Sequence, residues 1–379
     1  MSNVIEINDL EQLAGYRLHW QRLLGQTRRA TFFQSLDWLE VYWRHYGQGQ
    51  KLRVLIVEAH GEVIGIVPLV VRRKRSKLGR MRVLTYPLDD WGTFYGPIGP
   101  NPTATLHAAM QHIHSTTRDW DLLDLRWINN DHVDHRRTEL AMRKAGFGAD
   151  KKEMGQAGIA DLRDGWEAYW AARTSKWRTN VRADQRKLAK LGRVSYVHYR
   201  PGGTVGGEDD PRWDLYDACE EVARRSWQSA SQTGTTLSHE SVRSYLRDVH
   251  AVAVRCGALD VHLLLVDGRP VAFAYNYYWD GYVSGLRMGF DAQGGAKGAG
   301  TVLLRYALKE SAERGDHTYD MGAGYLACKY RWLSRTETIY RYTHYPLVNI
   351  RAQAMRAKHW LQRSLNGPPQ KSAPKAAGA

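Results

Sequence analysis

A glycine-rich loop with one lysine is the stretch whose residue types point most directly to chemistry. Residues 291–300 read DAQGGAKGAG, between a β-rich run at 282–290 and a helical pattern at 301–314. Small residues before a helix gather unpaired backbone N–H groups at the positive end of the helix dipole. That arrangement favours phosphate or pyrophosphate, and Lys297 adds a positive charge. The loop therefore predicts an anion site, unless its glycines serve only the geometry of a turn.

The loop does not match two common nucleotide-binding fingerprints. Its glycines at 294, 295, 298 and 300 lack the GxGxxG spacing, and no GxxxxGK[ST] motif occurs in the sequence. We therefore expect neither a Rossmann dinucleotide site nor a Walker phosphate loop.

Three other sets of residues are candidates for binding a substrate. Asp89, Asp90 and Trp91 lie in an aromatic, Pro- and Gly-rich loop, where acidic and aromatic side chains could hold a cationic or sugar acceptor. Arg178 lies on a basic helical segment and presents a planar fork to a carboxylate or phosphate. His262 alternates with apolar residues in a β-rich run and could point into a cleft. The competing interpretations are an Asp-rich turn, a solvated basic face and an ordinary core or surface histidine.

Composition narrows the class of protein. The 379 residues exceed the about 100–200 residues of a typical domain, and 43% hydrophobic residues suffice for folded cores. Three scattered cysteines, without CxxC or histidines at ligand spacing, predict neither a disulfide framework nor a metal site. The sequence lacks the run of about 18 apolar residues that a membrane span needs. Its acidic, polar N-terminus does not resemble a signal peptide, so we expect a cytoplasmic protein.

The net charge of +15 invites a nucleic-acid interpretation, because Lys and Arg patches bind polyanions by counterion release. The cations are, however, spread over residues 72–75, the segment 178–190 and the C-terminal tail. No recognised nucleic-acid motif accompanies them. Solvated faces are the first explanation, followed by anionic substrates, a membrane surface or RNA.

The elements that must position these residues occur in an order that is repeated. A hairpin predicted at 51–71 aligns with one at 259–279, placing Gly61 with Gly268, and later Asp124 aligns with Asp320. Helix, hairpin, strand, loop, helix and strand follow one another in both halves. We predict an α/β (α+β) protein of two similar units, each a mixed, mainly antiparallel sheet flanked by helices. The predicted parts are 1–160, 161–346 with a linking helix at 165–192, a basic helix at 347–365 and a disordered tail at 366–379.

Five segments in register resemble a known family. They are FFQSLDWLEVYWRHYG, SKWRTNVRADQRKLAKLG, LDVHLLLVDGRPVAFAYNYYWDGYVSGLRMGFD, GAGTVLLRYALKESAERGDHTYDMGAG and KYRWLS. In this order and spacing they resemble the CelD-like acyltransferases of the GNAT superfamily. These are similar to the FemAB-type peptidoglycan aminoacyltransferases, which contain two GNAT units in tandem. The likeness covers about residues 30–345.

The resemblance implies transfer of an acyl group from a thioester, usually acyl-coenzyme A, to an amine or hydroxyl of a small or glycan-linked acceptor. By the family pattern, the donor lies along the strand at 282–290, and backbone N–H groups before the next helix hold its pyrophosphate. The residues so implied are Met288, Lys297, Gly298, Ala299, Gly300 and Thr301. The sequence departs from the pattern because the Gln or Arg that leads the family motif is missing. Aminoacyl-tRNA as donor, and a non-catalytic polyanion-binding protein, remain the alternatives.

The acyl transfer that the resemblance implies has three candidate catalytic residues, of which Lys329 comes from a family motif and the other two from their positions. Lys329 matches the lysine of a FemAB-like Phe-Lys motif and would stabilise developing negative charge. Asp320, at a strand end, would orient the acceptor or act as base, and Tyr325 would protonate the leaving thiolate. The alternatives are a surface lysine and a structural carboxylate. Cys328 permits an acyl-enzyme in principle, but direct transfer is the habit of the family.

Overall fold

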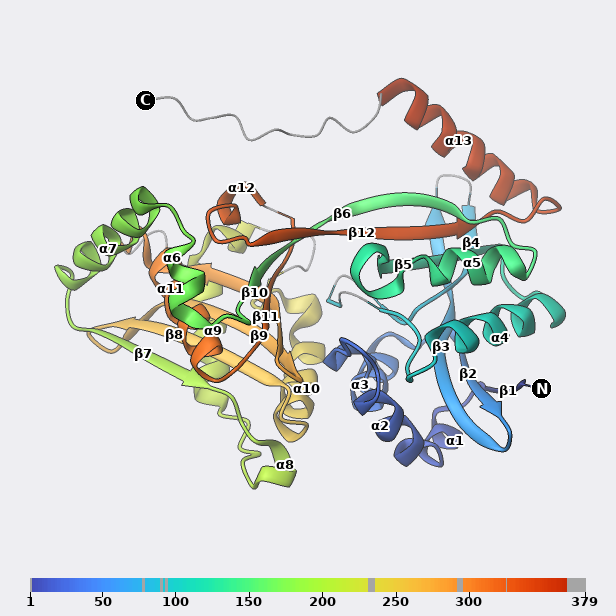
Figure 1. Cartoon of the computed structure of the whole chain (residues 1–379), viewed down its shortest axis with the longest axis horizontal. Coiled ribbons are helices and arrows are strands. Elements are labelled where there is room, and N and C mark those ends of the chain that lie inside the picture. Colours follow the sequence, from blue (N-terminus) through green and yellow to red (C-terminus); the bar gives the residue numbers. More distant parts are fainter. Residues whose placement is uncertain are drawn as a thin grey trace.

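The computed structural model describes residues 2–76, 79–88, 91–92, 95–230, 236–291, 296–324 and 326–366. Figure 1 shows strands and helices in both halves of the described chain. The strands are β1 (Ser2–Ile7), β2 (Lys51–Ala59), β3 (Glu62–Ser76), β4 (Gly79–Thr85), β5 (Leu122–Asn129), β6 (Asp150–Asp161), β7 (Val194–Tyr199), β8 (Leu259–Val266), β9 (Arg269–Trp279), β10 (Tyr282–Phe290), β11 (Thr318–Ala323) and β12 (Arg335–His344).

Helices flank these strands in both halves of the chain. The α-helices are α1 (Leu10–Ala14), α2 (Arg17–Gly25), α3 (Leu36–Tyr46), α4 (Pro102–Ser115), α5 (Arg137–Lys144), α6 (Gly165–Ala171), α7 (Ser175–Ala189), α8 (Gly203–Gly206), α9 (Trp213–Arg225), α10 (Glu240–Arg255), α11 (Ala299–Glu313), α12 (Leu326–Lys329) and α13 (Ile350–Asn366). Short 3-10 turns are η1 (Phe32–Gln34) and η3 (Trp227–Ala230), and η2 (Asn130–Asp134) is a π-helical turn. In the described part of the chain, none of these helices is both long and apolar enough to pass through a membrane.

Among the described residues, the strands form one 12-stranded sheet in the order β1-β2-β3-β4-β5-β12-β6-β11-β10-β9-β8-β7. The predicted repeat is visible in the order and direction of the strands in this sheet. In each half an antiparallel three-strand run, β2-β3-β4 or β8-β9-β10, is followed by a parallel partner, β5 or β11. Asp124 and Asp320, which align in sequence, lie on these two parallel partners. The predicted α/β class with a mixed, mainly antiparallel sheet is confirmed.

The long strands β6 and β12 join the two halves, as Figure 1 shows across its centre. They pair with each other from Arg335 to Thr343, while β6 also pairs with β11 and β12 with β5. The predicted boundary at residue 160 falls at the end of β6. Each half of the sheet is therefore completed by a strand from the other side of that boundary.

Sequence patterns did not predict β6, β12 or the edge strands β1 and β7. Two predicted helices are also divided in the structure. Apolar residues at helical spacing predict one helix at 8–24, but this segment forms α1 and α2. The linking segment 165–192, predicted as one helix, forms α6 and α7. The break before α7 has a local cause, because the Thr174 side chain accepts a hydrogen bond from the Trp177 amide and caps a new helix.

Helices of both halves share one apolar core. Tyr46 on α3 and Tyr245 on α10 contact edge to face with ring centres 5.0 Å apart, so α3 packs against α10 across the junction. On the other face of the sheet, Trp166 and Trp170 of α6 form a separate cluster with α11 and with Trp332. Helices therefore pack on both faces of the sheet, and the ends of β10 and β11 lie between these two helical layers.

Candidate functional site

The parallel strands β10 and β11 pair over only a few residues and then part. Their register runs from Tyr282↔Thr318 to Ser284↔Asp320. Beyond that point β10 has a bulge against β9 between Gly285 and Arg287, and a bulge bends a strand. A Cβ atom on Gly285 would lie 2.7 Å from the carbonyl oxygen of Asp320, so the parting strands can approach this closely only with glycine there. Asp320 therefore lies at the point where the two strands separate.

Asp320 is buried and has defined partners. Its Oδ2 accepts a hydrogen bond from the Tyr282 hydroxyl at 3.0 Å, and its Oδ1 accepts one from the Gly322 amide at 2.8 Å. Burial raises the pKa of Asp320 to about 6, against the lowering effect of these bonds and of the charge on Lys329. A carboxylate with this pKa is ionised at neutral pH and can still accept a proton, as a general base must.

Lys329 lies beside the same strand end. Its Nζ donates to the carbonyl oxygens of Met321 at 2.6 Å, Gly324 at 3.1 Å and Gly322 at 3.4 Å. Burial lowers the pKa of Lys329, and the negative charge of Asp320 opposes that shift. The structure thus brings Asp320 and Lys329 together. All three ammonium protons point at backbone carbonyls, so Lys329 holds the turn after β11 in shape.

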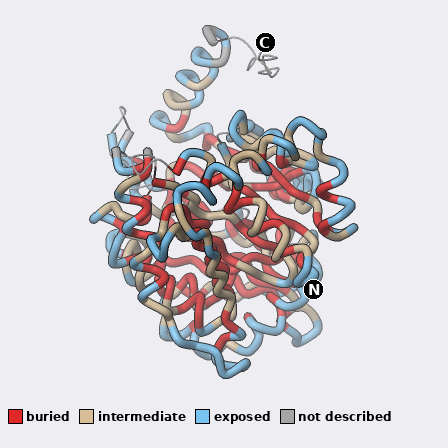
Figure 2. The backbone as a smooth tube through the Cα atoms, turned by 90° about the vertical axis from the view of Figure 1, so that its left-hand side faces the viewer, coloured by how far each residue is buried: buried red, intermediate tan, exposed pale blue. Residues whose placement is uncertain are grey.

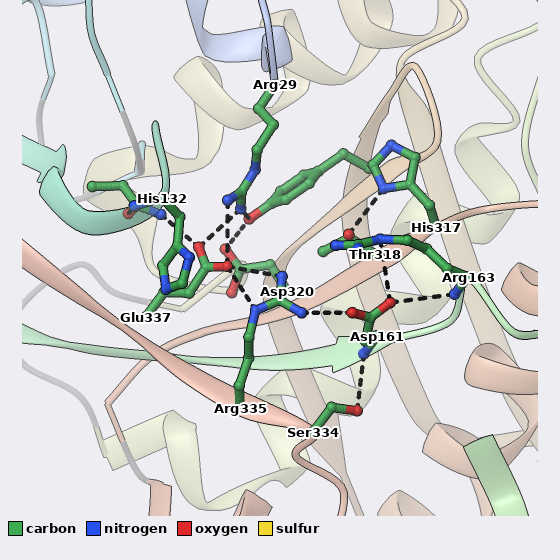
Figure 3. Close-up of polar contacts among 12 residues, drawn as sticks. Arg29, His132, Asp161, Arg163, His317, Thr318, Asp320, Ser334, Arg335 and Glu337 are labelled. Atoms are coloured by element: carbon green, nitrogen blue, oxygen red, sulfur yellow. Dashed lines mark hydrogen bonds and ion pairs between the residues drawn. The ribbon is translucent and has the colours of Figure 1, made fainter. Parts of the chain in front are cut away.

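A chain of buried polar groups continues from Asp320 into the N-terminal half, as Figure 3 shows. Arg29 Nη2 donates to the Tyr282 hydroxyl at 3.4 Å and to Glu337 Oε2 at 2.9 Å. The Glu337 side chain on β12 has no exposed surface and also accepts from Asn129 on β5 at 2.5 Å. Arg29, Tyr282 and Glu337 were not predicted as site residues. Because 253 residues separate Arg29 from Tyr282 along the chain, no local pattern could have linked them.

The predicted acceptor loop contributes one described residue. Trp91 is 4% exposed, and the Arg287 guanidinium on β10 lies 4.0 Å from the centre of a Trp91 ring. The loop of the first half therefore reaches the parting strand of the second. Asp89 and Asp90 lie outside the described residues, and so does the predicted catalytic Tyr325.

The predicted donor residues meet at the start of α11. Gly298 caps the helix with φ +93°, and a Cβ on Gly300 would lie 3.7 Å from Cε of Met288. Lys297 is exposed beside them. Within the described part of the chain, the amides of Gly300 and Thr301 in the first helical turn donate to no acceptor.

An acidic residue that the sequence analysis missed also lies at this helix start. A Cβ on Gly298 would meet the carboxyl carbon of Asp184 on α7 at 2.8 Å. Asp184 accepts from Lys187 Nζ at 3.2 Å, which offsets part of its charge. The carboxylate opposes a bound pyrophosphate, whereas the helix dipole favours one.

Two predicted binding residues lie in other networks. Arg178 Nη1 donates to the Ala171 carbonyl at the end of α6, at 3.3 Å. His262 is 3% exposed and its Nε2 lies 3.1 Å from Asp260 Oδ2. No contact among the described residues joins either of them to Asp320, so their predicted roles in substrate binding gain no support.

His262 belongs to a cluster with His198 and Asp260 that has the composition of a metal site. Both oxygens of Asp260 are already engaged, since Arg200 Nε donates to Oδ1 and Asn276 Nδ2 to Oδ2, each at 2.9 Å. The two imidazole rings are stacked 4.2 Å apart and tilted by only 4°. Parallel rings direct their lone pairs side by side rather than toward one ion. The cluster is better explained as a hydrogen-bonded core.

Comparison with known proteins finds a family match for part of the chain and a similar fold for nearly all of it. Residues 175–331 match the family described as acetyltransferase (GNAT) domain. The crystal structure of FemX is similar with a TM-score of 0.61 and 11% identity, covering 94% of this chain and 99% of that chain. A conserved protein of unknown function from Bacteroides thetaiotaomicron VPI-5482 is similar with a TM-score of 0.54 and 12% identity, covering 91% and 100%.

No curated protein matches the chain in sequence. The family match covers the segment that contains α7, β10, the start of α11, Asp320 and Lys329. The structural likeness to FemX extends over nearly the whole chain. The match over residues 175–331 bears out the resemblance to GNAT-type acyltransferases that the five sequence segments predicted, and it assigns an acetyltransferase (GNAT) domain to this part of the chain.

Proposed function

We propose that the protein transfers an acyl group directly from acyl-coenzyme A to an amine, or a hydroxyl, of a small or glycan-linked acceptor in the cytoplasm. One observation carries the proposal. Asp320, with its raised pKa, lies with Lys329 at the point where β10 and β11 part, and β10 continues from there to Met288 and the start of α11. A base on β11 and a candidate donor site along β10 are therefore adjacent where the two strands part.

The chemistry requires a neutral amine. Asp320 takes a proton from the acceptor nitrogen, whose lone pair attacks the thioester carbonyl. A C–N bond forms, the C–S bond breaks, and the thiolate leaves to be protonated by solvent or a nearby acid. Lys329 acts as a positioning residue, because its protons hold the turn at 321–324 and its charge lies near Asp320.

The donor would extend from the strand β10 to the first turn of α11. The amides of Gly300 and Thr301 and the ammonium of Lys297 supply the positive end of that site. The negative charge of Asp184, beside Gly298, opposes binding of a pyrophosphate at this position. This balance makes the affinity for coenzyme A sensitive to single charges at the helix start.

Aminoacyl-tRNA is the second candidate donor. It is favoured by Asp184 at the predicted pyrophosphate position and by the net charge of +15. In that case RNA should co-purify in a salt-sensitive manner, and free coenzyme A should not bind.

The proposed reaction is tested by thiol release from acetyl-coenzyme A with a panel of amines and amino sugars. Asp320→Asn should lower the rate by about 100-fold or more, the usual contribution of a general base. In the wild-type protein kcat/KM should fall below pH 6, because Asp320 is then protonated. Asp161→Asn, a nearby carboxylate paired with Arg335, is the matched control and should retain activity. A wild-type rate for Asp320→Asn would remove Asp320 as the base.

A further inference from the structure

The C-terminal helix α13 packs against the rest of the protein with one face and carries a stripe of apolar residues on the opposite face. Ala352 is fully buried and Met355 packs with it against a small core of β4 and β5. One turn on, His359 Nδ1 lies 2.9 Å from the Tyr345 hydroxyl. Residues three and four positions apart share one face of a helix, so these side chains define the inner face of α13. Ile350, Ala354, Ala357 and Leu361 form the stripe on the outer face.

That outer face is exposed and apolar. Ile350 is 86% exposed and Leu361 is 51% exposed, and Trp360 beside them is 65% exposed. Leu347 and Val348, directly before the helix, are 80% and 79% exposed. Figure 2 shows α13 standing away from the body of the molecule, with mostly exposed residues. Contiguous exposed apolar side chains mark a surface that binds something.

Cations border the outer face on both sides. At about 100° per residue, Arg351 and Lys358 lie on one edge of the stripe and Arg356 lies on the other. All three are exposed. The sequence from Leu347 to Asn366 contains no Asp or Glu. An apolar stripe between two basic edges is typical of helices that lie in the interface of an anionic membrane.

A basic recess lies at the start of the same helix. Its volume is about 270 Å³, and its lining residues are Arg73, Arg80, Met81, Arg82, Asp121 and Arg351. Arg351 joins the helix to the recess by donating to the Arg80 carbonyl at 3.3 Å. Asp121 is paired with Arg82 at 3.3 Å, so one carboxylate faces four guanidinium groups. The recess is thus suited to an anionic phosphate.

We propose that α13 and this arginine recess form a docking surface for an anionic phospholipid bilayer. The outer stripe would enter the headgroup region, while the recess holds lipid phosphate. The apolar side chains favour a bilayer over RNA, because a polynucleotide backbone would leave Ile350 and Leu361 without apolar partners. The inference does not depend on the acyl donor.

The test is sedimentation of the full chain with vesicles of phosphatidylcholine alone or with phosphatidylglycerol added, at physiological salt. We expect binding only to the anionic vesicles. Leu361→Gln should weaken it by about tenfold, because insertion of a leucine is lost. Arg351→Gln should weaken it by about fivefold, the usual effect of one cation near an anionic surface.

Matched controls distinguish the surface from general charge or hydrophobicity. Leu18→Gln removes a leucine of α2 that is 79% exposed, and Arg255→Gln removes an exposed cation at the end of α10. Both should bind as the wild type does. Equal binding to neutral and anionic vesicles would overturn the proposal, and so would undiminished binding of Leu361→Gln. RNA binding that Arg351→Gln weakens, without vesicle binding, would assign the surface to a polynucleotide instead.

Discussion

At the scale of single residues, the site depends on one carboxylate that the fold makes less acidic. Asp320 is fully buried, and its pKa of about 6 means that the folded protein disfavours its ionised form. The folded-state value is above the unfolded one, so this penalty is absent at low pH and grows as pH rises toward 6. At neutral pH Asp320→Asn should therefore raise the free energy of unfolding, by about 1–3 kcal/mol, even though it removes the base. Loss of activity in that variant would not reflect misfolding.

Lys329 provides a second residue-scale prediction. Lys329→Met keeps the aliphatic stem but removes the three bonds to the carbonyls at 321, 322 and 324. The turn beside Asp320 should loosen, lowering kcat by about 10-fold to 100-fold through misplacement of the base. Affinity for the donor, measured by calorimetry, should change less than about twofold, because the ammonium of Lys329 is engaged by the turn at 321–324. Lys309→Met on α11, 39% exposed at its side chain, is the control. A loss confined to affinity would move Lys329 into the donor site.

At the scale of elements, the parting of β10 and β11 depends on Gly285. Gly285→Ala would place a Cβ atom 2.7 Å from the Asp320 carbonyl oxygen and push β11 away. We expect the free energy of unfolding to fall by about 1–3 kcal/mol, as for other overpacked sites, in urea titrations. Gly155→Ala on β6, where a Cβ would meet nothing within 4 Å, should change it by less than about 0.5 kcal/mol. Equal effects would show that this contact is not tight.

The same elements show what sequence patterns could predict. The apolar spacing of residues 240–255 and the glycine at 257 are local signals, and they predict a helix with the bounds that α10 has in the structure. Strand β12 does not show in the sequence because RTETIYRYTH has polar residues at most positions. Glu337 is buried in an ion pair with Arg29, which lies 308 residues away, as well as with Arg335 on the same strand. Likewise α13 has its apolar stripe outside, so periodicity found the helix and not its packing face.

At the scale of the whole molecule, the halves are joined through Glu337. Arg29→Ala would leave this buried carboxylate with one arginine fewer, and breaking a buried pair typically costs about 3–5 kcal/mol. Arg29 and Arg335 hold the pKa of Glu337 below its usual range against the effect of burial. Their contribution to stability is therefore present above the unfolded-state pKa and lost as pH falls through the folded-state value.

Thermal unfolding at several pH values tests this role. Arg29→Ala should lower Tm at pH 7 and converge with the wild type in acid. Arg44→Ala, which breaks an exposed pair with Asp248 between the same halves, should cost less than about 1 kcal/mol. If both variants lose the same stability at pH 7, Glu337 is not the dominant link.

The donor site is the central claim, and calorimetric titration with coenzyme A and a series of acyl-coenzyme A thioesters tests it most directly. We predict micromolar binding that Lys297→Glu weakens by about tenfold, through charge reversal beside the pyrophosphate. Asp184→Asn should strengthen it, because a like charge is removed from the start of α11. Opposite effects of the two variants would establish the site. Absence of binding to every thioester, or affinities that neither variant alters, would contradict it and favour aminoacyl-tRNA as the donor.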